Sequence, residues 1–146
     1  MRQAEDDPII LLVSRSLSPF IMLFGIYVIF HGHYSPGGGF QGGAMLAAAF
    51  ILIRLTSGIR IAQLQLKSTL AGPLGALGVL IFFGTGLAAM LAGGNFLDYR
   101  FLPLAGFEGA ELRAFGILII EIGVGLAVMA ILTTIYDNLL EDQNDA

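Results

Sequence analysis

Four long apolar stretches, separated by shorter polar segments, dominate the hydropathy pattern of this sequence. They cover about residues 9–31, 38–56, 70–92 and 115–136. A helix needs about 20 mostly apolar residues to cross the hydrocarbon core of a bilayer. The pattern therefore predicts an all-α integral membrane protein with four transmembrane helices. The second stretch is short for a span, so we expect its helix to begin within glycines 37–39.

The segments between the stretches are compatible with one membrane domain, residues 1–146, folded as a single helix bundle. No internal repeat or linker divides the chain. Residues 60–67 alternate apolar and polar side chains, which favours a position at the membrane interface. Residues 93–113 place aromatic side chains beside acidic ones, which is typical of an interfacial loop or of one that contacts a partner.

Composition agrees with a membrane protein. Hydrophobic residues make up 56% of the chain and charged residues 12%, against roughly 45–50% and 25% in soluble domains. The mean hydropathy is +0.83. The chain has no cysteine, which excludes disulfides and thiolate metal sites. Its net charge of −4 comes largely from acidic residues near the ends, at 5–7 and 137–145, and argues against binding to nucleic acid. The first apolar stretch lacks the features of a cleaved signal peptide, so we expect it to remain.

The distribution of Lys and Arg predicts the orientation. Five basic residues lie on the side of the termini and the second loop, and two lie on the other side: Arg2, Arg15, Arg54, Arg60 and Lys67 against Arg100 and Arg113. Basic residues concentrate in cytoplasmic segments. Both termini are therefore predicted to be cytoplasmic.

Twenty glycines in a short membrane chain indicate close helix contacts. In lipid, small residues allow helix backbones to approach closely enough for van der Waals packing. Three pairs have the i, i+4 spacing that makes a flat stripe: Gly43 with Ala47, Gly72 with Ala76, and Gly84 with Ala88. Some of these contacts are expected to involve other subunits, although ordinary glycine enrichment in membrane helices is the simpler alternative.

Glu121 is the charged residue that the pattern singles out. It lies within the last apolar stretch, and no other charge occurs between residues 115 and 135. A carboxylate at membrane depth is costly and marks a functional site by default. It either binds or relays a cation, which we favour, or pairs with a polar group on a partner helix and serves assembly. Gly125, one turn on, would let a neighbour or a water reach it. Arg15 is the only basic residue expected to enter a span deeply, and it is predicted to lie too far away to pair with Glu121.

The densest polar cluster joins the first two spans and reads HGHYSPGGGFQGG, residues 31–43. Its consecutive glycines allow a turn that exposes backbone N–H groups at the positive end of a helix dipole. Such a turn can form the wall of a vestibule. His31 and His33 titrate near neutrality, so a proton relay is possible, although interfacial hydrogen bonding is an equal alternative. Two histidines without a third ligand do not predict a metal site. Gln41 is placed to bond the loop backbone.

Enzyme chemistry is not supported by any motif. The chain lacks a phosphate-binding loop and a zincin pattern, and it lacks a nucleophile elbow. We predict no cofactor and no catalytic residue.

Two segments resemble the MnhB family. Each member of this family is a small membrane subunit of a multi-subunit Mrp-type sodium/proton antiporter. Residues 20–52, FIMLFGIYVIFHGHYSPGGGFQGGAMLAAAFIL, are similar to the opening half of the family, and residues 120–125, IEIGVG, are similar to its final helix. Residues 93–113 contain no motif of the family. The positions matched by motif are His31, His33, Pro36, Gly37, Gly38, Gly39, Phe40, Gln41, Gly42, Gly43 and Glu121.

The resemblance implies a multi-pass protein of a prokaryotic cell membrane, an accessory subunit of a complex that exchanges sodium ions for protons. Its partners would be the other components of the Mrp antiporter, MrpA, MrpC, MrpD, MrpE, MrpF and MrpG, of which MrpA and MrpD are thought to contain the main proton channels. The same glycine-rich block occurs in subunits of membrane-bound hydrogenase complexes. The alternatives are therefore a subunit of a hydrogenase-type complex or a purely structural adaptor. A self-assembling small channel is a third alternative, suggested by the glycine stripes.

Overall fold

The computed structural model describes residues 7–32, 37–104, 106–107 and 109–144, apart from the side chains of 59–60 and 141–144. Over these residues the chain is helical and has no strand. Its elements are α1 (Pro8–His31), α2 (Gly39–Gln65), α3 (Ser68–Leu91), a short 3-10 turn η2 (Tyr99–Phe101) and α4 (Gly109–Asn144). Each of the four α-helices contains a stretch long and apolar enough to span a membrane. The predicted fold class, an all-α protein with four such helices, is confirmed.

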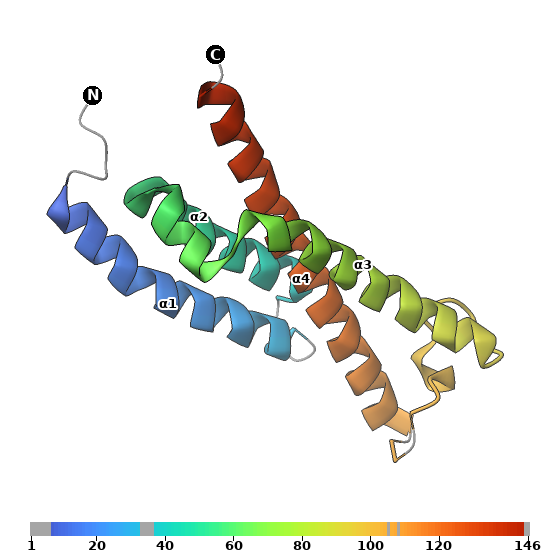
Figure 1. Cartoon of the computed structure of the whole chain (residues 1–146). Coiled ribbons are helices and arrows are strands. Elements are labelled where there is room, and N and C mark those ends of the chain that lie inside the picture. The colour runs from blue at the N-terminus through green and yellow to red at the C-terminus, as the bar shows by residue number, and fades with distance from the viewer. Residues whose placement is uncertain (1–6, 33–36, 105, 108, 145–146) are drawn as a thin grey trace.

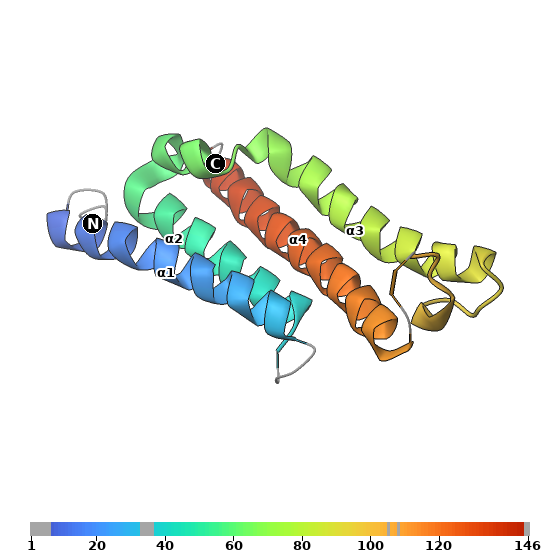
Figure 2. The same cartoon turned by 90° about the horizontal axis from the view of Figure 1, so that it is seen from below.

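The four helices of the predicted bundle are arranged in a row. Helix α1 packs mainly on α2, α2 on α4, and α4 on α3, so the order across the row is α1, α2, α4, α3 (Figures 1 and 2). Helices α2 and α4 occupy the centre and run in the same direction. Because a row leaves both of its faces uncovered, large apolar side chains remain exposed along α1 and α3.

Glycines hold the centre of the row together. A Cβ atom added at Gly43 of α2 would lie 2.5 Å from the carbonyl oxygen of Gly125 in α4, and one added at Gly78 of α3 would lie 2.5 Å from that of Gly123. Only glycine permits such close backbone contact. Of the three predicted small-residue pairs, Gly43 with Ala47 lies in a helix contact, because both residues are buried. The other two pairs have no such contact at their glycines. Nothing lies within 4 Å of a Cβ atom added at Gly72 or Gly84.

Helix α2 is broken at Gly58, whose backbone angles are φ 75° and ψ 162°. The membrane-spanning part of α2 is therefore Gly39–Gly58. The remaining helical residues lead to Leu66, which is buried and caps the helix. Because glycine adopts a positive φ without strain, Gly58 lets the chain turn at the end of the span and re-enter the row at α3.

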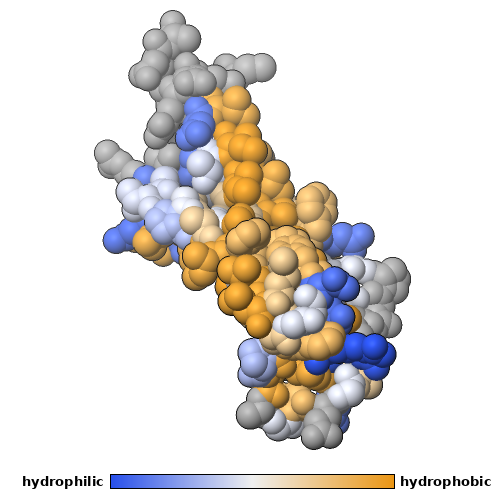
Figure 3. Space-filling view, turned by 90° about the vertical axis from the view of Figure 1, so that its right-hand side faces the viewer, coloured by the Kyte–Doolittle hydropathy of each residue, from blue (hydrophilic) through white to orange (hydrophobic). Residues whose placement is uncertain are grey.

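The loop between α3 and α4 folds back onto its own helices. Phe96 packs against Phe82 and Phe83 of α3, and Leu102 is buried with Ala89 and Leu112. This loop therefore covers the ends of α3 and α4, whereas its predicted contact with a partner stays a prediction. Figure 3 shows a broad apolar surface with hydrophilic residues gathered towards both ends of the molecule, as expected for a protein surrounded by lipid.

The start of α1 and the end of α4 lie at the same end of the row (Figure 1). The connection between α2 and α3 lies there too, whereas the end of α1, the start of α2, the end of α3 and the start of α4 lie at the opposite end (Figure 2). We call these the terminal end and the turn end of the molecule. The cytoplasmic location of the terminal end stays a prediction.

Candidate functional site

Glu121 lies where α2 begins. Its carboxylate accepts a hydrogen bond from the backbone N–H of Gly39, the first residue of α2. The first N–H groups of a helix have no partner within the helix and form the positive end of its dipole. The carboxylate therefore lies at the positive end of the α2 dipole. Glu121 thus caps a helix whose first residue is 82 positions earlier in the chain.

The glycines of the turn make room for this carboxylate. A Cβ atom added at Gly38 would lie 2.7 Å from Oε2 of Glu121, and one added at Gly39 would collide with the carbonyl oxygen of Glu121. Gly38 also has a φ of 141°, which favours glycine. The two features that the sequence singled out separately, the acid and the glycine-rich turn, are therefore one site.

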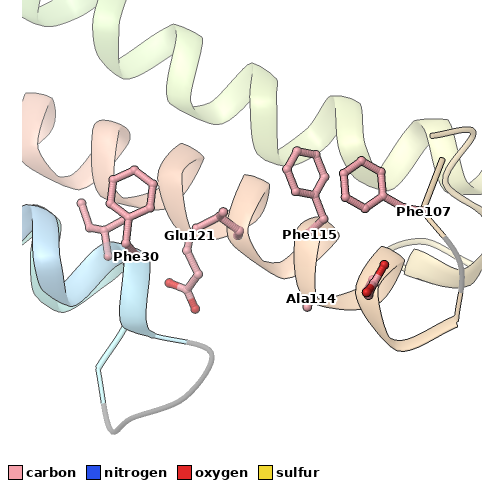
Figure 4. Close-up of a pocket in the computed structure, with 8 residues that line it drawn as sticks. Phe30, Phe107, Ala114, Phe115 and Glu121 are labelled. Carbon is pink, nitrogen blue, oxygen red and sulfur yellow. The ribbon is translucent and has the colours of Figure 1, made fainter. Parts of the chain in front are cut away.

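Glu121 also lines a pocket of about 390 Å³ on the side of α4. The pocket lies between the last turn of α1 and the first half of α4, and it is mostly apolar, as Figure 4 shows. Its lining consists of two carboxylates, three aromatic rings and three aliphatic residues: Ile29, Phe30, Phe107, Glu111, Ala114, Phe115, Leu118 and Glu121. The side chain of Glu121 is neither fully exposed nor sealed. It is therefore accessible from the pocket.

The pocket exists because the helices are staggered. Helix α1 ends at His31 and α2 begins at Gly39, both near the level of Glu121. Helix α4 begins at Gly109, twelve residues before Glu121, and therefore extends about 18 Å further towards the turn end at 1.5 Å per residue. The α1–α2 pair thus leaves one side of this part of α4 uncovered.

Gly37 is partly buried beside Val28 of α1, and the other predicted site residues divide into three groups. Gly42 and Gly43 are buried and pack against α1 and α4. His31, Phe40 and Gln41 are exposed at the turn end, and Nδ1 of His31 lies 3.1 Å from the carbonyl oxygen of Tyr27, on whose ring it stacks. His33 and Pro36 lie outside the described residues. The proton-relay role of His31 and His33 stays a prediction.

A second charged cluster, which sequence reasoning missed, lies at the terminal end of the same α2–α4 interface. Nε of Arg54 donates to Oδ1 of Asp137 at 2.6 Å, and the two side chains are 0% and 5% exposed. Oγ of Ser68 donates to Oδ2 of Asp137 at 2.9 Å. Nη2 of Arg54 also donates to the carbonyl oxygen of Leu66 at 3.1 Å. The cluster ties α2, α4 and the start of α3 together.

Two expectations are corrected by this cluster. Arg15 was expected to be the only basic residue deep in a span, yet Arg54 is buried whereas Arg15 is exposed and donates to Ser57 at 3.3 Å. Asp137 was counted with the acidic C-terminal end, yet it is buried. A signal existed in the sequence, because the second and fourth spans run in the same direction and each carries one charge near the same end.

One titratable group outside the spans is affected by Glu121. Burial raises the pKa of Tyr99, and the negative charge of Glu121 raises that pKa further. Tyr99 lies in η2 and packs on α4, where its ring would contact a Cβ atom added at Gly116. The loop and the site are therefore electrostatically coupled.

The chain matches known proteins over nearly its whole length. Residues 9–134 match the family model described as a domain related to the MnhB subunit of Na+/H+ antiporter. An uncharacterized protein of Methanocaldococcus jannaschii is 38% identical over 135 residues, which are 89% of this chain and 51% of that protein. The MnhB-type Na+/H+ antiporter subunit of Alkalihalophilus pseudofirmus is 30% identical over 141 residues, 94% of each chain. The equivalent antiporter subunit of Bacillus subtilis is 30% identical over 145 residues, 97% of this chain and 98% of that subunit.

A solved structure has the same fold. One chain of the membrane-bound sulfane sulfur reductase, an archaeal respiratory membrane complex, superposes with a TM-score of 0.68 at 33% sequence identity. The match covers 96% of this chain and 60% of that one. This chain therefore spans about half to two-thirds of the longer relatives and nearly all of the antiporter subunits. It is a multi-pass membrane protein, and it belongs to the family of domains related to the MnhB subunit of Na+/H+ antiporters.

Proposed function

We propose that this chain is an accessory membrane subunit of a multi-subunit antiporter that exchanges Na+ or another monovalent cation for protons. In this proposal it is a transporter component and not an enzyme, and it assembles with the other Mrp-type subunits. Its own contribution to transport is Glu121, which borders a hydrated path for the cation or the proton. The glycine-rich turn shapes the end of that path.

The position of the Glu121 carboxylate is the observation that carries this proposal. The carboxylate is held at the N-terminus of α2, where it accepts from the backbone N–H of Gly39, and it lines a pocket on the side of α4. A carboxylate within a span that keeps free acceptor positions is what a cation or proton site requires. The relatives named as Na+/H+ antiporter subunits support the assignment to antiport because they align with 94% or more of this chain.

The test is antiport in membrane vesicles that contain the complete complex with Glu121→Gln. This change removes the charge with little change of shape, and the amide oxygen can still accept from Gly39. We expect antiport to be lost while the amount of assembled complex is unchanged. Glu111→Gln is the matched control, because Glu111 lines the same pocket but is exposed. It should retain most of the antiport.

A purely structural adaptor makes the opposite prediction. In that case Glu121→Gln reduces antiport only in proportion to lost assembly, which native gel electrophoresis of the complex measures. Normal antiport with normal ion affinity in an assembled Glu121→Gln complex would show that the carboxylate is not on the path.

The second candidate function is membership of a membrane-bound respiratory complex. The similarity to a chain of the sulfane sulfur reductase complex favours it. Isolation of the complex from its native membrane separates the two candidates. Co-purification with antiporter subunits alone supports the first, and co-purification with redox subunits supports the second.

A further inference from the structure

The spans of this chain contain no charged side chain between the levels of Glu121 and Asp137. Glu121 and Asp137 are 16 residues apart on α4, which corresponds to about 24 Å of helix, most of the roughly 30 Å hydrocarbon core. Residues 122–136 contain no Asp, Glu, Lys, Arg or His. Neither do residues 16–30 of α1, residues 40–53 of α2 or any residue of α3.

The α2–α4 interface between these levels is also physically closed. The backbones of Gly43 and Gly125 are in close contact, and Ala47, Ile53 and Thr133 are at most 2% exposed. The hydroxyl of Thr133 donates to the carbonyl oxygen of Met129 in its own helix. At the terminal end the interface is closed by the ion pair of Arg54 and Asp137.

The pocket at Glu121 opens sideways instead. It is formed by the stripe Glu111, Ala114, Phe115, Leu118 and Glu121 on α4 and by the end of α1. These positions follow the i, i+3, i+4, i+7 spacing of one helix face. About 18 Å of α4 beyond Glu121 is free of the α1–α2 pair. A helix of another polypeptide can lie along this stripe.

The charge of the pocket restricts what can fill it. Two of the eight lining residues are carboxylates and none is basic. Among the described residues Glu121 has one hydrogen-bond donor, Gly39, although a carboxylate can accept several. A lipid chain would leave the rest of this charge without a partner, which is costly in hydrocarbon.

We propose that the pocket is the docking site for a membrane span of another subunit, which places a lysine or histidine opposite Glu121. The route of the ion beyond Glu121 then continues on that subunit and not through this chain. This inference rests on the proposed function at Glu121 and adds the direction of the path and the chemistry of the partner.

Photo-crosslinking in the complete complex, in its native membrane, tests the proposal. A p-benzoyl-phenylalanine at Phe115 places the probe in the pocket, and the same substitution at Phe20, which is 69% exposed on α1 and outside the pocket, is the matched control. We expect the Phe115 probe to form an adduct with a span of a different polypeptide that has a lysine or histidine within one helical turn. The Phe20 probe should not label that span. Adducts only with lipid, adducts with a second copy of this chain, no adduct, or a span without a basic residue would each overturn the proposal.

A cysteine variant provides an independent test in case the Phe115 variant does not fold. The chain has no cysteine, so Leu118→Cys introduces a single thiol on the pocket stripe. A membrane-permeable maleimide should label it after the complex is dissociated in detergent but not in the intact complex. Equal labelling in both states would contradict docking.

Substitution of the crosslinked lysine or histidine by glutamine links docking to transport. We expect loss of antiport with the complex still assembled, as for Glu121→Gln. Retained antiport would contradict the proposed route. If Glu121→Gln itself leaves antiport intact, the proposed function fails; if Glu121→Gln abolishes antiport but crosslinking finds only lipid, this inference alone fails.

Discussion

Two acids of α4, Glu121 and Asp137, differ in their burial and in their partners. Asp137 is buried, paired with Arg54 and hydrogen-bonded to Ser68. Glu121 has one described donor, the backbone of Gly39, and lines a pocket. A carboxylate whose acceptor sites are filled by its own chain has a structural role, whereas one with access can exchange an ion. A charge in a span is therefore interpreted from its partners and not from its depth alone.

Breaking the charged cluster of Arg54, Asp137 and Ser68, which we call the closed site, should have the largest effect on stability. Asp137→Asn leaves Arg54 buried without a counter-charge, and breaking a buried ion pair costs about 3–5 kcal/mol. Unfolding in mixed micelles of increasing denaturing detergent measures the change. Glu121→Gln, which keeps its hydrogen bond to Gly39, should cost less than about 1.5 kcal/mol. Equal costs for the two variants would contradict the distinction between the sites.

A double variant sharpens the same comparison. Arg54→Met combined with Asp137→Leu removes both charges, and replacing a buried pair by apolar residues is often close to neutral. We therefore expect the double variant to be more stable than Asp137→Asn alone. Destabilisation equal to the sum of the single changes would show that the two side chains do not act as a pair.

The glycine contacts between the two sites give the next largest effect. Gly43→Ala places a Cβ atom 2.5 Å from the carbonyl oxygen of Gly125, and overpacking of this kind costs about 1–3 kcal/mol. Gly84→Ala is the matched control, since nothing lies within 4 Å of the added atom. It should be neutral or slightly stabilising in the same assay. A neutral Gly43→Ala would show that α2 and α4 are not in backbone contact.

The hydroxyl at the closed site should contribute less. Ser68→Ala removes one donor to Asp137 but leaves its pair with Arg54. Loss of one such hydrogen bond to a charged group costs about 1.5–3 kcal/mol when the group stays buried, and the intact ion pair should keep the loss at the low end. The unfolding midpoint of Ser68→Ala should lie between those of wild type and Asp137→Asn.

The smallest effect concerns how stability depends on pH through Tyr99, near Glu121. The pKa of Tyr99 is raised, first by burial and then by Glu121, so the folded state holds the phenol proton more tightly than the unfolded chain does. This contribution to stability is complete below the unfolded pKa of about 10 and is lost as the pH rises through the higher folded pKa. Tyr99→Phe should weaken the fall in stability above about pH 10. Glu121→Gln should weaken it in part, and an unchanged profile in both variants would exclude Tyr99 as its source.

Much of the fold was visible in the sequence because membrane spans are set by local hydropathy. The four apolar stretches became four helices, and Glu121 stood out because every neighbour from residue 115 to 135 is uncharged. The row arrangement and the stagger of α1 and α2 against α4 were not predictable, because they depend on which glycines meet across helices. Gly43 and Gly125 are 82 positions apart in the chain.

The closed site was missed for a related reason. Arg54 and Asp137 each lie near the end of an apolar stretch, where a charge is ordinary. Their burial follows from the break at Gly58, which brings Leu66 and Ser68 over Arg54 and Asp137. By contrast, the glycine-rich turn was recognised from its composition, and only its contact with Glu121 required the structure.

The most direct test of this account is the rate of antiport per assembled complex in vesicles that contain Glu121→Gln, compared with Glu111→Gln in the same preparation. The account predicts loss of antiport for Glu121→Gln, near-normal antiport for Glu111→Gln, and equal amounts of complex for both. Normal antiport per complex in Glu121→Gln would contradict the claim that the open carboxylate on α4 belongs to the ion path.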